Sequence, residues 1–282
     1  MPAAIKGIDH PVIAVRDMEE ARGRYARLGF TIPPRGSHIQ WGTGNWCMMF
    51  PDDYLELRGI VDPARYTHDL DKFLAVREGL MGIAFAPESA DKTYTLASAA
   101  GLNPAPPREL TRNFEHPEGF TKPSFRLVFL DPKKTPELMA SLACEHLTPD
   151  LIRRPDWLNH PNGVTGIASM TSVVEDPNAV IENQGKLFGA NNVARKDSGV
   201  SVRVSLSATV RFISPAEASE QDEAIPGVKP PYLSSITLRC GSVSGTAAVL
   251  KANGIPFDTA ADGGIRVGPT EACGTILRFI GR

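Results

Sequence analysis

A histidine lies in the middle of an apolar stretch near the start of the chain, in the segment Gly7-Ile8-Asp9-His10-Pro11-Val12-Ile13-Ala14-Val15. This stretch predicts a short buried strand, in which alternation puts Ile8, His10 and Val12 on one face. A buried imidazole without a partner costs free energy, so the ring needs a hydrogen bond or a metal ion. His10 is therefore the first candidate metal ligand, and a hydrogen-bonded core histidine is the alternative.

Glu56 is the candidate partner of His10. In a strand over residues 54–59, Tyr54, Glu56 and Arg58 face one way and two leucines face the other. The leucine face suits packing under a helix, so we expect the opposite face to line the same concave surface as His10. An imidazole and a carboxylate on such a surface are typical metal ligands. The alternative is that Glu56 only forms an ion pair with a nearby arginine.

His146 is the third candidate ligand and ends an apolar run over residues 139–146. Together with His10 and Glu56 it makes a set of two histidines and one carboxylate, with positions left for water and substrate. The alternative for His146 is a cap on the turn at Thr148-Pro149. Other residues are candidates to line the pocket and bind substrate: His38, Trp41, Asn45, Tyr54 and Arg126. His38 is expected in a loop at the pocket mouth, where an exposed histidine without function is the alternative.

The elements that carry these residues repeat along the chain. The first sixty residues predict the order β-α-β-β-β, with Asp17 as the N-cap of the helix. Without a gap, Gly7-Ile8 matches Gly166-Ile167, and Val15-Arg16-Asp17 matches Val174-Glu175-Asp176. Further copies begin near residues 80 and 234. Four units predict two domains. Their expected bounds are 1–146, which holds the candidate metal site, a linker at 147–160, and 161–282.

Four such units with a histidine in the first strand resemble the vicinal oxygen chelate superfamily, of the glyoxalase, bleomycin-resistance and dioxygenase type. The segments that look like its glyoxalase-like domain branch are Gly7-Ile8-Asp9-His10, Trp41-Gly42-Thr43-Gly44-Asn45, Tyr54-Leu55-Glu56-Leu57, His146-Leu147-Thr148-Pro149 and His160-Pro161-Asn162-Gly163. The resemblance implies an α+β fold. Its four βαβββ modules would pair into two curved mixed β-sheets with helices on the outer faces. It also implies metal ligands from the first and last strands of each unit.

The second domain differs at the matching positions. The alignment puts Ser169 where the first domain has His10, and Arg211 lies near the position of Glu56. Arg278 lies in the matching strand of the last unit. We therefore expect this half to lack the metal. Its arginines suggest either an anion-binding pocket or a scaffold or dimer face.

Composition excludes several classes of partner. The 282 residues carry a net charge of −2 without a basic block, which speaks against nucleic acid and anionic membranes. The sequence has no signal-peptide pattern and no apolar run that could span a bilayer, so the expected location is the cytoplasm. The four cysteines are far apart and are expected to be reduced. The expected partner is a small-molecule substrate, and a homodimer is possible.

The resemblance implies a metal-dependent lyase or isomerase that acts on a small oxygen-rich or carbonyl substrate. A divalent ion (Zn, Ni, Co, Mn or Fe) would chelate vicinal oxygens, and Glu56 would act as the base. Only three of the four ligands common in glyoxalases are present. A non-haem iron ring-cleaving dioxygenase is an alternative, although such members carry the metal in the second pair of units. A non-enzymatic protein that sequesters small molecules is the other alternative.

Overall fold

The first sheet is closed into a barrel. The structure is a computed structural model and describes residues 2–116 and 119–281. Nine strands follow the order β2-β3-β4-β1-β5-β9-β8-β6-β7, and β2 also pairs with β6, which closes the sheet on itself. The strands are β1 (Ile5–Ala14), β2 (Gly36–His38), β3 (Thr43–Met49), β4 (Tyr54–Ile60), β5 (Gly79–Pro87), β6 (Arg108–His116), β7 (Gly119–Thr121), β8 (Ser124–Phe129) and β9 (Leu142–His146).

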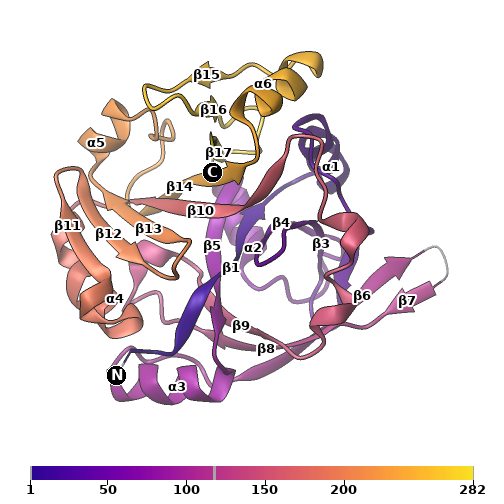
Figure 1. The fold of residues 1–282 in the computed structure, drawn as a ribbon. Coiled ribbons are helices and arrows are strands. Elements are labelled where there is room, and N and C mark those ends of the chain that lie inside the picture. Colours follow the sequence, from indigo (N-terminus) through magenta and orange to yellow (C-terminus); the bar gives the residue numbers. More distant parts are fainter. Residues whose placement is uncertain (1, 117–118, 282) are drawn as a thin grey trace.

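The second sheet has eight strands in the order β11-β12-β13-β10-β14-β17-β16-β15. Figure 1 shows it in orange and yellow, against the indigo and magenta strands of the barrel. Its strands are β10 (Val164–Val173), β11 (Val193–Lys196), β12 (Gly199–Arg203), β13 (Thr209–Ile213), β14 (Tyr232–Cys240), β15 (Asp258–Thr259), β16 (Ile265–Val267) and β17 (Ile276–Gly281).

The helices confirm the predicted repeat. The first strand of each unit leads into a helix, and three further strands follow in the first, third and fourth units. Four follow in the second unit, where β7 is an additional short strand. Asp17 caps the first helix as predicted, accepting a hydrogen bond from the backbone N–H of Glu20 at 2.9 Å. The helices are α1 (Met18–Arg27), α2 (Leu70–Val76), α3 (Ala90–Ala99), α4 (Ile181–Phe188), α5 (Pro215–Glu220) and α6 (Val243–Ala252). Short 3₁₀ turns are η1 (Pro136–Leu138), η2 (Pro149–Leu151), η3 (Pro155–Trp157), η4 (Pro177–Val180) and η5 (Ala190–Asn192). The fold is α+β, as expected.

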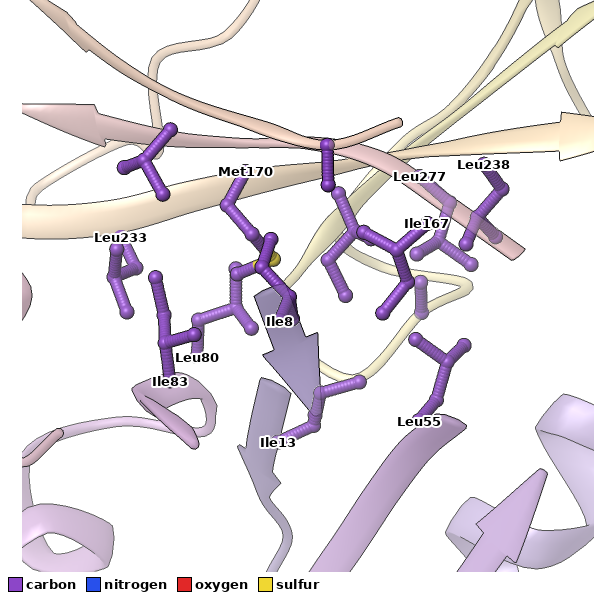
Figure 2. Close-up of a cluster of buried hydrophobic side chains, with 14 of the residues drawn as sticks. Ile8, Ile13, Leu55, Leu80, Ile83, Ile167, Met170, Leu233, Leu238 and Leu277 are labelled. Carbon is purple, nitrogen blue, oxygen red and sulfur yellow. The ribbon is translucent and has the colours of Figure 1, made fainter. Parts of the chain in front are cut away.

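The two sheets share one hydrophobic core. Figure 2 shows Ile13 and Leu55 of the barrel facing Met170 and Leu277 of the second sheet. Burial of this apolar face is the main force that holds the halves together. The core also determines which way each face of β4 points. Its two leucines face the core, as predicted from alternation, so Glu56 faces into the barrel.

Strand β1 departs from simple alternation. Ile8 pairs with Phe85 and His10 pairs with Ala84, so Asp9 is an extra residue in a β-bulge. The prediction that Ile8 and His10 share a face is therefore wrong. Ile8 lies in the core between the sheets (Figure 2), whereas His10 lines the barrel interior.

The second half repeats the bulge at the aligned position. Ile167 pairs with Leu238 and Ser169 with Thr237, so Ala168 takes the place of Asp9. The pairing between parallel strands also repeats: Val12 lies opposite Glu56 in the first half, and Thr171 lies opposite Arg211 in the second. The gapless alignment of the two halves is thus correct in structure. No helix of the described residues is long and apolar enough to cross a membrane.

Candidate active site

The β-bulge brings Asp9 and His10 into contact. His10 Nδ1 lies 2.7 Å from Asp9 Oδ2, and both side chains are buried. The ring stacks on Tyr54 with a centroid distance of 4.3 Å. The imidazole is thus fixed in orientation, with Nε2 directed away from Asp9.

Glu56 occupies the other side of the ring. His10 Nε2 lies 3.2 Å from Glu56 Oε2. The same oxygen accepts a hydrogen bond from Arg58 Nη2 at 2.7 Å, and Asn45 Nδ2 donates to Oε1 at 2.6 Å. Both carboxylate oxygens therefore have partners, and the predicted pair of His10 and Glu56 is in contact.

Two buried carboxylates contact the His10 imidazole, and these contacts determine the protonation states of His10 and Glu56. Burial alone would lower the pKa of His10, but the hydrogen bonds to Asp9 and Glu56 outweigh it and raise the pKa above 6.5. Burial would raise the pKa of Glu56, but the charge of Arg58 and the contact with His10 hold that pKa well below its usual range. Glu56 is therefore ionised at neutral pH.

His146 reaches this group through Asp9. Its Nε2 lies 2.9 Å from Asp9 Oδ2, the oxygen that also contacts His10. The three predicted ligands thus do not converge on one point: His10 contacts Glu56, whereas His146 contacts Asp9. Asp9 was not among the predicted site residues, and the one available signal was an acidic residue directly before the histidine.

The barrel encloses a small cavity beside the His10 ring. Its volume is about 20 Å³, which is room for one or two water molecules. Four of the five residues predicted to line the pocket and bind substrate line this cavity together with His10 and Glu56: His38, Trp41, Asn45 and Tyr54. The remaining lining residues are Arg58, Leu110, Arg112, Phe125, Leu127, Leu142 and Cys144.

His38 is a buried residue of β2, so both the predicted loop position and the alternative of an exposed histidine are wrong. Its Nδ1 lies 2.8 Å from Thr43 Oγ1. Burial and the nearby charge of Arg58 lower the pKa of His38 to about 3. The ring is therefore neutral at neutral pH, and its role in the cavity is that of a hydrogen-bonding group.

Arg126 requires a correction. It lies on the outer face of β8, where its guanidinium pairs with Asp91 of α3. Its neighbours Phe125 and Leu127 line the cavity instead. The strand was predicted correctly, but its two faces were not assigned, and alternation around two apolar neighbours indicates that Arg126 points outward.

Arg112 is a cavity residue that was not among the predicted site residues. It lies on β6 and is 2% exposed, with the rings of Phe114 and Phe125 each 5.3 Å from its guanidinium carbon. Its Nη1 donates to Cys47 Sγ at 3.3 Å. The one signal in the sequence is alternation with Leu110 and Phe114, which puts Arg112 on the same buried face of β6.

The donor atoms differ in how well they suit a metal ion. At the predicted set, a divalent ion would face the Arg58 charge beside Glu56, and both oxygens of that carboxylate already accept hydrogen bonds. The arrangement therefore does not fit a metal there. One donor atom each of Asp9, Cys144 and His146 lies within 4.8 Å of the others. Carboxylate, thiolate and imidazole are the ligand types that zinc takes.

In the second half, a buried acidic residue contacts Arg211, which is equivalent to Glu56 of the first half. Arg211 Nη1 lies 2.9 Å and Arg278 Nη1 3.1 Å from Glu223 Oε1. Ser235 donates to the other oxygen of Glu223 at 3.0 Å, and Glu223 is fully buried. The predicted arginines are present, and they bind a carboxylate of the chain itself.

Comparisons with known proteins agree with this fold. A family model described as "Glyoxalase-like domain" matches residues 8–188, more than half of the chain. A search of curated proteins found no match. A solved structure titled as a hypothetical protein from Staphylococcus aureus has a TM-score of 0.70 at 11% identity, with 98% of this chain and 99% of that chain covered.

Two further solved structures are similar at a TM-score of 0.61. One is titled as a fusion of a xylose isomerase-like TIM barrel with 4-hydroxyphenylpyruvate dioxygenase, at 15% identity. All of this chain is covered, but it spans only 50% of that protein. The other is a mutant of 4-hydroxymandelate synthase from Streptomyces coelicolor, at 13% identity, with 99% and 93% covered. At these identities the likeness extends to the fold alone.

Proposed function

The chain belongs to the glyoxalase-like domain family of the vicinal oxygen chelate superfamily, and from this premise we propose that it is a lyase or isomerase that moves a proton on a small substrate inside the barrel. The substrate class is a small molecule with a carbonyl or hydroxyl oxygen. The observation that carries the proposal is the His10 imidazole, held between Asp9 and Glu56 on the cavity wall.

His10 is the proposed acid–base residue. General acid–base catalysis works best when the pKa of the group lies near the working pH, and two carboxylates raise the pKa of His10 above 6.5. Asp9 fixes Nδ1, so proton exchange with substrate takes place at Nε2. Glu56 orients Nε2 and stabilises the imidazolium form, and its low pKa makes it the weaker base of the pair.

Metal dependence is a separate part of the proposal. Asp9, Cys144 and His146 would hold a divalent ion, and zinc suits their donor types best. Such an ion would act as a Lewis acid and lower the pKa of a bound water. The set of His10, Glu56 and His146 would require Glu56 to give up Arg58 and Asn45. The contact between His146 and Asp9 would have to open for either set. The requirement at Glu56 makes the dioxygenase alternative less well supported.

Hydrogen exchange tests the proposal without knowledge of the product. Protein is incubated in D₂O with a panel of small 2-oxo and 2-hydroxy compounds, and loss of carbon-bound hydrogen is followed by proton NMR. We expect the wild-type protein to exchange one member of the panel and His10→Asn to lose at least about 100-fold of the rate, since general acid–base groups contribute that much.

His116→Asn is the matched control. His116 lies on β6 with Nε2 2.9 Å from Thr121 Oγ1, away from the cavity lining. It should exchange at the wild-type rate. If compounds bind in the cavity but none exchanges, the sequestration alternative is correct and the proposed reaction is not.

A further inference from the structure

Arg112 is a buried cation with unused hydrogen-bond donors. Its Nε and Nη2 have no hydrogen-bond partner among the described residues, although the side chain is 2% exposed. The third nitrogen contacts only the thiol of Cys47, and burial raises the pKa of that thiol to about 11. Cys47 is therefore neutral and does not balance the arginine. A buried guanidinium without an anion is costly, so such a group points to a ligand.

The other charges of the cavity are already matched. Arg58 is paired with Glu56, and Asp9 lies between two imidazoles. Arg112 therefore has no carboxylate left for it among these groups. It is also held in place, because its guanidinium packs over the rings of Phe114 and Phe125. A rigid, correctly placed guanidinium binds an anion at a low cost in side-chain entropy.

The second half of the molecule contains buried arginines that do have a carboxylate partner. There, two arginines inside the sheet bind the buried carboxylate of Glu223, with distances of 2.9 and 3.1 Å. A planar carboxylate matches the fork of an arginine, which presents its N–H groups side by side. The cavity beside Arg112 is small, at about 20 Å³. This volume favours the smallest carboxylates, such as formate and acetate, over phosphate or a long acid, and a 2-oxo or 2-hydroxy acid requires neighbouring side chains to move.

We propose that Arg112 binds the carboxylate of a short-chain acid in the barrel cavity. Resting on the proposed function, this makes the substrate a small 2-oxo or 2-hydroxy acid: the carboxylate contacts Nε and Nη2 of Arg112, and the neighbouring oxygen faces His10. Arg112 is then the residue that selects acids over neutral aldehydes and ketones of the same size.

Binding measurements test this independently of turnover. Formate, acetate, glycolate and pyruvate are titrated into the full chain by calorimetry, each beside its neutral amide, with chloride as a small-anion control. We expect a carboxylate to bind and its amide to bind at least about 10-fold more weakly, because a charge-assisted hydrogen bond is lost. Arg112→Met should lose the same factor, whereas Arg126→Met, a matched arginine on the outer face, should bind as the wild type does.

A second readout uses the wild-type protein alone, so it does not depend on the folding of a variant. The Nε–H resonance of Arg112, assigned in the wild-type protein through the side-chain resonances of Arg112, should shift on titration with the carboxylate and not with the amide. Equal affinity for acid and amide, an unchanged affinity in Arg112→Met, displacement by chloride at equal concentration, or no binding by any of the four acids would overturn the proposal. Carboxylate binding without hydrogen exchange would instead refute only the proposed reaction.

Discussion

The carboxylate of Asp9 and the imidazole of His10 are neighbours in the chain and yet hydrogen-bonded to each other, at 2.7 Å. Adjacent residues of a regular strand point to opposite faces, so this contact exists because Asp9 is the extra residue of a β-bulge. The bulge thereby places a second carboxylate beside the ring, and it connects His10 to His146 through one oxygen.

Asp9→Asn should lower the pKa of His10. The carboxylate of Asp9 is one of two groups that raise this pKa against the effect of burial, so without its charge burial is opposed only by Glu56. The folded-state pKa lies above the unfolded value of 6.5, so the His10 interaction stabilises the fold fully below pH 6.5. That stability is lost as the pH rises through the folded pKa. NMR titration of the His10 ring measures the change. Asp91→Asn, on the surface, should leave the His10 titration as it is, and an unchanged titration in Asp9→Asn would contradict the assignment.

Alternation predicted one wall of the site because β4 is a regular strand. The two leucines identify the core face, so Tyr54 and Glu56 follow as cavity residues without further information. The same rule failed at Asp9, since a bulge adds one residue and reverses the faces beyond it. Nothing in the local composition distinguishes a bulge from a regular strand, although its repetition at Ala168 shows that it belongs to the repeating unit.

The surroundings of Arg112 could not be predicted from the sequence for a different reason. They depend on β6 closing the barrel against β2, a contact between segments more than seventy residues apart. Alternation with Leu110 and Phe114 indicates the face on which Arg112 lies, but it does not indicate that this face lines a closed barrel. The fold class was predictable because each unit repeats, whereas the charges inside the barrel depend on how the units meet.

Gly36→Ala should disturb the site with little effect elsewhere. A Cβ at this position would lie 2.2 Å from Asn45 Oδ1 and 3.2 Å from Arg112 Cδ. The amide of Asn45 would have to move, and with it the hydrogen bond to Glu56. We expect a loss of about 1–3 kcal/mol in unfolding free energy, as for other overpacked sites, together with weaker ligand binding. Denaturant unfolding and calorimetry measure both.

Gly23→Ala is the control for this substitution. Gly23 is an exposed residue of α1, and a Cβ there meets nothing within 4 Å. Alanine should stabilise the helix by about 0.5–1 kcal/mol and leave binding unchanged. A Gly36→Ala protein with wild-type stability and binding would show that Asn45 has room to move.

Asp53→Asn should flatten the pH dependence of stability. Burial raises the pKa of Asp53 to about 7, although its oxygens accept hydrogen bonds from the backbone N–H of Ile167 at 3.1 and 3.2 Å. The folded pKa of Asp53 is raised above the unfolded value of 3.8, so the protein is most stable when this carboxyl is protonated. The contribution is complete below pH 3.8 and is lost as the pH rises through 7. The wild-type protein should therefore lose on the order of 1–4 kcal/mol relative to Asp53→Asn between pH 4 and pH 8. Denaturant unfolding of both proteins across this range gives the difference, and parallel curves would exclude a raised pKa.

Cobalt binding tests the donor set of Asp9, Cys144 and His146. Cobalt(II) replaces zinc in such sites, and a thiolate ligand gives a charge-transfer absorption. Burial holds the pKa of Cys144 well above its usual value, so binding should release a proton from this thiol and weaken as the pH falls. We expect Cys144→Ser to lose the absorption and Cys47→Ser, the other buried cysteine of the cavity region, to keep it. An absorption that persists in Cys144→Ser would place the ion elsewhere.

Glu223→Ala should destabilise the second sheet and be rescued by a small acid. The substitution leaves Arg211 and Arg278 without their shared carboxylate, at a cost of about 3 kcal/mol in unfolding free energy. These arginines hold the pKa of Glu223 below its ordinary value of 4.5 against the effect of burial. The stabilisation is therefore present above pH 4.5 and is lost as the pH falls through the folded pKa.

Glu182→Ala, which removes an exposed partner of Lys186, should cost less than about 1 kcal/mol. Acetate should raise the melting temperature of Glu223→Ala more than that of the wild type, because it can occupy the position of the lost carboxylate. Equal shifts in the two proteins would mean that the arginines do not bind a free acid.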